Sequence, residues 1–229
     1  NAQDLMAFVT AINKGEDFSA YKNDKGEVCL EADIDMAKAK KMQVIKSFGG
    51  VFNGQGFAIK NWSATGGLFV KNAGVVKNIV IDESCSLEAY HEDGKDINVA
   101  FVVEYNEPDG LVAGCVNNGN VTVSDLSKVA HRVAGVVGAS YGKMKDCINN
   151  GTITVGSEVD LGNGQNIAGV VGYINPNAGS KAALGKVLVE NCVNNGNVNV
   201  YFNCKPKSVN VGGVVASTQN HALATEGGK

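Results

Sequence analysis

The sequence of 229 residues has little charge, little proline and almost no arginine. Charged residues make up 19% of the chain and hydrophobic residues 44%, a balance that excludes an intrinsically disordered chain. No apolar run approaches the roughly 18 residues that cross a bilayer, so no membrane-spanning helix is predicted. Arg132 is the one arginine among 20 basic residues. Because bidentate phosphate recognition depends on arginine, nucleic acid is not an expected partner.

Cysteine and histidine residues at the spacing of a metal site are also absent from the sequence. Six cysteines form no CxxC pair and have no histidine nearby at the spacing of a zinc site: Cys29, Cys85, Cys115, Cys147, Cys192 and Cys204. His91, His131 and His221 are scattered, and we expect each to be a surface or loop residue. The sequence therefore predicts no metal ion, no cofactor and no catalytic residue.

The first residues predict a short helix. The chain begins at Asn1 without Met or a signal peptide, which we interpret as the start of a trimmed mature chain. Residues 2–14 carry apolar side chains at roughly helical spacing, and Gly15 follows as a stop signal. An amphipathic helix packed against the remainder is expected.

Internal repetition is the main signal. One segment type recurs as TGGLFV from Thr65, VAFVVE from Val99, VAGVVG from Val133, IAGVVG from Ile167 and VGGVVA from Val211, at offsets of 34, 34, 34 and 44. A second block follows within the repeats: GCVNNGNVTV from Gly114, DCINNGTITV from Asp146 and NCVNNGNVNV from Asn191. The first repeat carries NIVIDESCSL from Asn78 at this place, with Ile79 where the others have cysteine.

Short strands separated by Asn-Gly pairs fit two architectures. Asn-Gly between apolar alternations favours hairpins, and hence a meander or propeller, but a propeller blade needs about 40–45 residues. A solenoid of parallel coils fits better, with Asn and Gly in left-handed conformations at the corners. Equivalent residues then stack about 4.8 Å apart. We align Cys85 with Val121, Ile153 and Val198, and Leu87 with Val123, Val155 and Val200.

The same stacking decides the expected cysteine chemistry. Neighbours about 4.8 Å apart are within reach of a disulfide, but parallel side chains give poor dihedral geometry. We expect free, buried thiols that act as small apolar groups. The column of Asn117, Asn149 and Asn194 is interpreted as turn residues that bond to the backbone, not as a site.

The repeat starts, the NC[VI]NNG blocks and the alternation after them resemble the GLUG-type repeats of adhesin-like surface proteins from gut Bacteroidetes. SFGGVFNGQGFAIKNW (47–62) looks like a further motif of that family, G-x-F-[DN]-G-x-G-x-x-I. It is carried by Gly50, Phe52, Asn53, Gly54, Gly56 and Ile59. The resemblance covers nearly the whole chain.

Several residues depart from this pattern. Phe101 replaces the Gly of the repeat start, while Val70, Glu104 and Ala216 stand where a closing Gly is expected. We interpret these departures as local loops on one face.

The resemblance implies a right-handed parallel β-helix, secreted or attached to the bacterial surface, and the handedness also follows from the crossover rule for parallel strands. We expect a single domain over 1–229 with about six coils. In it, 1–64 form the capping helix and first coils, and 65–229 form repeats of about 34 residues. A terminal coil needs a cap or a neighbour, so a natural chain that continues past Lys229 is expected.

The expected function is a non-catalytic adhesin-like module that presents loops to a glycan or a host surface protein. A lipid anchor on a segment removed before Asn1 is compatible with this reading. A β-helix polysaccharide lyase or glycoside hydrolase, and a purely structural spacer, are the alternatives.

Charged candidates have simple structural explanations. The densest acidic stretch lacks the D-x-D-x-D spacing of a calcium loop, and a solvated loop is favoured: Asp82, Glu83, Glu88, Glu92, Asp93 and Asp96. The run Lys38, Lys40 and Lys41 is interpreted as a surface turn, with contact to acidic glycans as the alternative.

Aromatic residues offer one candidate surface. Trp62, the one tryptophan, is expected to pack in the core instead of stacking on sugar. Tyr141 and Tyr173 follow equivalent repeat starts and are expected to lie near each other, where an exposed aromatic strip would bind a glycan. Ordinary surface tyrosines explain them equally well, as they do Tyr90, Tyr105 and Tyr201.

Overall fold

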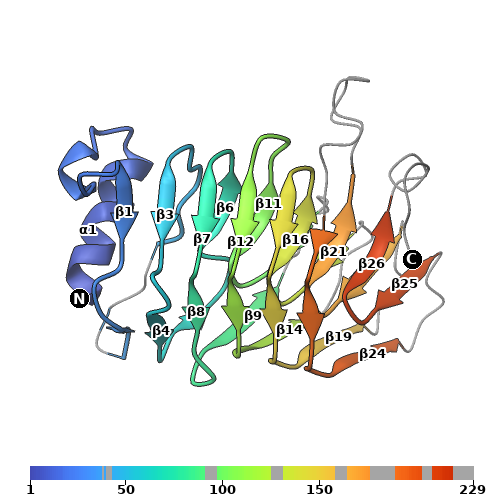
Figure 1. Cartoon of the computed structure of the whole chain (residues 1–229). Coiled ribbons are helices and arrows are strands. Elements are labelled where there is room, and N and C mark those ends of the chain that lie inside the picture. Colours follow the sequence, from blue (N-terminus) through green and yellow to red (C-terminus); the bar gives the residue numbers. More distant parts are fainter. Residues whose placement is uncertain are drawn as a thin grey trace.

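The computed structural model describes residues 1–37, 39, 43–90, 97–124, 131–157, 164–175, 189–202 and 208–218. Within these residues the chain winds into a parallel β-helix, with its coils stacked from the N-terminal to the C-terminal end (Figure 1). A complete coil contributes one short strand to each of five parallel sheets, as β10 to β14 do between residues 97 and 124. The predicted all-β solenoid is therefore confirmed.

Each sheet is named here by its first strand in the chain, and its members follow in stacking order. The β1 sheet contains β1 (Glu27–Cys29), β3 (Val51–Asn53), β7 (Val75–Lys77), β12 (Leu111–Ala113), β17 (Lys143–Lys145) and β22 (Val189–Glu190). The β2 sheet contains β2 (Ile34–Asp35), β4 (Ala58–Lys60), β8 (Val80–Ile81), β13 (Val116–Asn117), β18 (Ile148–Asn149) and β23 (Val193–Asn194). Each of these two sheets has six strands, which agrees with the expected six coils.

Three sheets complete the wall of the coils. The β5 sheet contains β5 (Ser63–Ala64), β9 (Ser86–Tyr90), β14 (Asn120–Ser124), β19 (Ile153–Ser157) and β24 (Val198–Phe202). The β6 sheet contains β6 (Phe69–Asn72), β11 (Val103–Asn106), β16 (Val137–Ser140), β21 (Val171–Ile174) and β26 (Val215–Thr218). The β10 sheet contains β10 (Ile97–Val99), β15 (His131–Val133), β20 (Gln165–Ala168) and β25 (Val209–Gly212).

The predicted helix covers the N-terminal end of the coils. Helix α1 (Ala2–Asn13) is capped by Asn1, whose side chain accepts hydrogen bonds from the backbone of Gln3 and Asp4. Its Phe8 is buried, and the ring centroid lies 6.0 Å from that of Phe52 in the first β-helical coils. The 3₁₀ helix η1 (Ser19–Tyr21) follows. The helix thus shields apolar side chains that an open end would expose to water.

The interior changes from aromatic to aliphatic and polar along the axis. Phe48, Phe52 and Phe69 pack together near α1, with centroids 5.3–6.4 Å apart across the cluster that they form with Phe8. Further on, Cys115 and Cys147 are fully buried. Asn117, Asn149 and Asn194 form a ladder of side-chain hydrogen bonds, each 2.8 Å long. The cysteines among the described residues are free thiols, as predicted, but Cys29 and Cys192 are only half-buried, and Cys204 lies outside the described residues.

The left-handed corners lie at a different place from the predicted one. The glycines of the Asn-Gly pairs are outside the left-handed region, which is occupied by the residue before each Cys115-type position: Asn78, Gly114, Asp146 and Asn191, with φ of 55°, 60°, 55° and 51°. Glycine is required in the pairs for another reason. A Cβ on Gly151 would overlap the carbonyl oxygen of Gly119, because successive coils meet closely there.

One predicted alignment is wrong by two residues. Val121 pairs with Leu87, not with Cys85, and Val123 pairs with Ala89. The turn between Ile81 and Ser86 holds four residues, whereas the turn between Asn117 and Asn120 holds two. The longer turn is held by Ser84, whose backbone N–H and hydroxyl group both donate to Asp82 Oδ1.

Two further predictions are corrected. Val70, Glu104 and Ala216 do not form loops, because they lie within β6, β11 and β26. His131 is not a surface residue: it is fully buried in β15, since strand alternation turns its side chain to the interior in register with Ile97. His91 and His221 lie outside the described residues.

Candidate functional site: a groove beside a tyrosine strip

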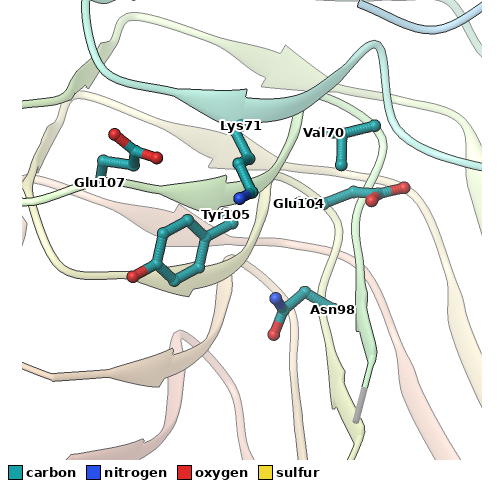
Figure 2. Close-up of a pocket in the computed structure, with 6 residues that line it drawn as sticks. All are labelled: Val70, Lys71, Asn98, Glu104, Tyr105 and Glu107. Carbon is teal, nitrogen blue, oxygen red and sulfur yellow. The ribbon is translucent and has the colours of Figure 1, made fainter. Parts of the chain in front are cut away.

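The outer surface is hollowed where the β10 sheet and the β6 sheet lie close together. A Cβ on Gly138 of β16 would come within 2.8 Å of the Glu104 carbonyl oxygen and 2.9 Å of the Asn98 Cβ. In the coil before it, the same crease opens into a hollow of about 390 Å³. This Glu104 hollow is lined by Val70, Lys71, Asn98, Glu104, Tyr105 and Glu107 (Figure 2).

Three tyrosines continue from the hollow along the helix axis. The ring centroids of Tyr105 and Tyr141 are 4.9 Å apart, and those of Tyr141 and Tyr173 are 6.5 Å apart. The three rings come from successive coils, and each is half-buried. Burial, with the neighbouring Tyr141, raises the pKa of Tyr105 and of Tyr173, which keeps both phenols neutral. We call these three residues the tyrosine strip; it confirms the expected proximity of Tyr141 and Tyr173 and adds Tyr105.

Arg132 connects the two ends of this surface. Its guanidinium carbon lies 5.1 Å from the ring centroid of Tyr173, a cation–π distance. On the other side, Nη1 donates to Oδ1 of Asn98 in the Glu104 hollow, at 3.4 Å. The chain's single arginine is thus positioned beside the tyrosine strip.

Glu104 is the unusual residue of the hollow. The backbone N–H of Gly67 donates a 2.8 Å hydrogen bond to its Oε1. Burial raises the pKa of the Glu104 carboxyl group to about 7, so protonated and ionised forms coexist near neutral pH. Figure 2 shows Lys71 and Tyr105 side by side, with the Glu104 carboxyl group directed away from the Tyr105 ring.

Sequence reasoning missed Glu104 as a site residue. Strand alternation is interrupted in β11: Val103 and Asn106 are buried, and the two residues between them are half-buried. The alternation of buried and exposed residues expected for a strand therefore gives no indication that Glu104 and Tyr105 both line the Glu104 hollow. The available signal was the replacement of a repeated glycine by an ionisable residue.

The other candidates form no site in the described residues. Trp62 is buried against Phe101, with centroids 5.8 Å apart, as predicted for a core residue. Glu83 and Glu88 are exposed, and Asp82 holds the turn described above. Tyr201 is 59% exposed on β24, away from the strip. Outside the described residues lie Lys38, Lys40, Lys41, Glu92, Asp93 and Asp96, as does the side chain of Tyr90.

The described part of the chain has neither a cluster of metal ligands nor a membrane-spanning helix. Histidine, cysteine and acidic side chains do not gather there in groups of three or more that could hold a metal ion. No helix in the same residues has the length and apolarity needed to cross a membrane.

The fold and this groove define the protein as a parallel β-helix with an aromatic surface beside an acidic hollow. No family model and no curated protein matches the chain, so the resemblance to GLUG-type repeats stays a prediction. A similar solved structure is a Bacteroides ovatus protein described as a "putative immunoglobulin A1 protease". It is 15% identical, with a TM-score of 0.47, over 92% of this chain and 76% of the other. A likeness this distant supports no argument about activity.

Proposed function

We propose that this protein is a non-catalytic, adhesin-like module of the bacterial surface or exterior that binds a polysaccharide along the tyrosine strip. The observation that carries the proposal is the row of three half-buried rings in successive coils, with centroids 4.9 and 6.5 Å apart. A polymer of linked units suits a surface whose rings extend over three successive coils.

The chemistry of the strip supports a carbohydrate ligand. Sugars have apolar C–H faces that pack on aromatic rings and hydroxyl groups that need hydrogen-bond partners. Phenol groups of the strip, the Arg132 guanidinium and the Asn98 amide provide donors and acceptors at its edge. The surface therefore combines the two kinds of contact that a glycan requires.

Hydrolysis is the second candidate, because Glu104 and Glu107 line the same hollow. A glycosidase places two carboxyl groups on either side of the bond that it cleaves, about 5–9.5 Å apart. In Figure 2 these two side chains lie on opposite sides of Tyr105 and Lys71 and do not face each other. This arrangement favours binding over cleavage.

Affinity electrophoresis through gels that contain neutral or acidic polysaccharides tests the proposal. We expect at least one polymer to retard the protein, and Tyr141→Ala to weaken that retardation about tenfold, since the middle ring of the strip is lost. Tyr201→Ala removes an exposed ring on another sheet and serves as the control. A cleared zone in the stained gel would establish an enzyme, and unretarded migration in every gel would contradict glycan binding.

A further inference from the structure

Glu104 occupies a place in the crease that other coils leave to smaller residues. The register places Val70, Gly138, Gly172 and Ala216 at the equivalent positions of the β6 sheet. In the neighbouring coil Gly138 is needed, because a Cβ there would crowd the Glu104 carbonyl oxygen and Asn98. A carboxyl group at this position therefore needs extra space from elsewhere.

That space comes from Gly66 and Gly67. A Cβ on Gly66 would lie 2.9 Å from Glu104 Oε1. A Cβ on Gly67 would overlap the Ala100 carbonyl oxygen of the next coil and lie 3.0 Å from the Glu104 Cγ, so glycine there serves both the contact between coils and the Glu104 side chain. At the position of Gly66, the next three repeats carry alanine: Ala100, Ala134 and Ala168. The two glycines and the Gly67 N–H thus form a cradle for one carboxyl group, in one coil of the helix.

The cradle leaves the carboxyl group able to bind a ligand. A carboxylate accepts about four hydrogen bonds, and the Gly67 N–H uses one of these positions. The Glu104 hollow also offers the Asn98 amide and the apolar side chain of Val70, while the Lys71 ammonium group and the ring of Tyr105 line its other side. Donors, acceptors and a ring together suit a polyhydroxylated ligand.

Charge around the hollow favours a neutral ligand. Lys71 from β6 and Arg132 from β15 are the nearby cations, while Glu104 and Glu107 are the acidic groups, with the neutral phenol of Tyr105 between them. The two cations offset the two carboxyl groups, so an acidic sugar gains no net attraction there, whereas a neutral sugar needs only hydrogen-bond partners.

We propose that the Glu104 hollow holds one neutral sugar residue of the bound glycan, with Glu104 hydrogen-bonded to its hydroxyl groups and Val70 against its apolar face. This inference rests on the proposed function and extends it, because it names the class of sugar and the residue that anchors it. The remaining sugar units then follow the tyrosine strip toward Tyr173.

Binding should depend on pH with a defined sign. Hydroxyl groups donate more strongly to an ionised carboxylate than to a neutral carboxyl group. The pKa of Glu104 in the folded protein without ligand is about 7, so this carboxyl group ionises between pH 6 and pH 8. Affinity for a neutral glycan should therefore rise over that range. A ligand with its own carboxylate would show the opposite trend, since ionised Glu104 repels it.

The experiment measures binding of galactomannan, xyloglucan, yeast mannan and polygalacturonate at pH 6, 7 and 8. Wild type, Glu104→Gln and the exposed control Glu88→Gln on β9 are compared. We expect a neutral polymer to bind, its affinity to fall about tenfold at pH 8 in Glu104→Gln, and the pH dependence to disappear in that variant only. The glutamine keeps an acceptor for Gly67, and circular dichroism checks the fold of each variant.

Each other outcome has one meaning. Equal binding by wild type and Glu104→Gln at every pH would contradict the role of Glu104 in holding the sugar, but it would leave the proposed function intact. Binding of polygalacturonate alone would contradict the proposal that the bound sugar residue is neutral. Failure of every polymer to bind wild type overturns the proposed function together with this inference. If Glu104→Gln does not fold, Gly66→Ala replaces it, because its methyl group would displace the carboxyl group.

Discussion

Nδ2 of Asn117 donates a 2.8 Å hydrogen bond to Oδ1 of Asn149 in the next coil, and both side chains are fully buried. Asn149 repeats the contact to Asn194 and also donates to the carbonyl oxygen of Gly151. The buried amides therefore satisfy one another and the turn backbone, which makes the ladder a structural element inside the helix.

Asn149→Ala should destabilise the protein by about 2–3 kcal/mol, because it leaves a buried donor on Asn117 and a buried acceptor on Gly151 without partners. Asn150→Ala is the matched control. Asn150 bonds to Asn118 and Asn195 at 2.7 and 2.8 Å, but on the exposed surface, so we expect a loss below about 1 kcal/mol. Urea unfolding followed by circular dichroism measures both, and equal losses would contradict the buried role.

Gly151→Ala should cost at least about 2 kcal/mol, because the added methyl group overlaps the Gly119 carbonyl oxygen of the adjacent coil. Gly49→Ala introduces the same group where no atom lies within 4 Å, and it should be nearly neutral. Thermal melting of the two variants distinguishes them. Similar melting temperatures would show that the coils do not meet closely at Gly151.

Cys147 should resist alkylation in the native protein. A hydrogen bond with Cys115, together with burial, raises the pKa of the Cys147 thiol to about 12, so the reactive thiolate is scarce at pH 8.5. Cys29 is only half-buried and should react faster with iodoacetamide. Peptide mass mapping after timed labelling compares the two, with denatured protein as the fully labelled reference. Labelling of Cys147 at the rate of Cys29 would show that Cys147 does not lie in the core.

Glu104 should make stability depend on pH. Its pKa is about 7 in the folded protein and near 4.5 when unfolded, so the folded state holds the proton more tightly. Stability from this group is therefore lost as pH rises from about 4.5 to 7, by at most about 3 kcal/mol. We expect Glu104→Gln to gain stability relative to wild type at pH 8 but not at pH 4. Urea unfolding curves for both proteins at the two pH values provide the measurement. The same difference in stability between the two proteins at pH 4 and pH 8 would contradict the raised pKa of Glu104.

Repeated residues made most of the fold predictable. The offset of 34 between Val103, Val137 and Val171 is the register that the β6 sheet adopts, because a solenoid stacks equivalent residues on one another. The alignment failed where the first repeat differs, at Cys85, since a turn longer by two residues absorbs the difference without disturbing the strands on either side.

The candidate site was only partly predictable. Tyr141 and Tyr173 follow successive repeat starts and were expected together, although Tyr173 is in register with Ala139, whereas Glu104 breaks the repeat and was assigned to a loop. Its significance depends on Gly66 and Gly67, about one coil earlier in the chain, which make room for its carboxyl group. No local pattern connects residues that far apart.

The sequence by itself determined the parallel β-helix, its coil length, the capping helix and the buried column of cysteines, because each follows from residues that recur at a fixed spacing or from helical periodicity. Tertiary structure decided where the left-handed corners lie, which glycines are needed for close contact between coils, and how Glu104, Tyr105 and Arg132 come to share one surface. These features depend on distances between neighbouring coils and sheets, which only the packed structure sets.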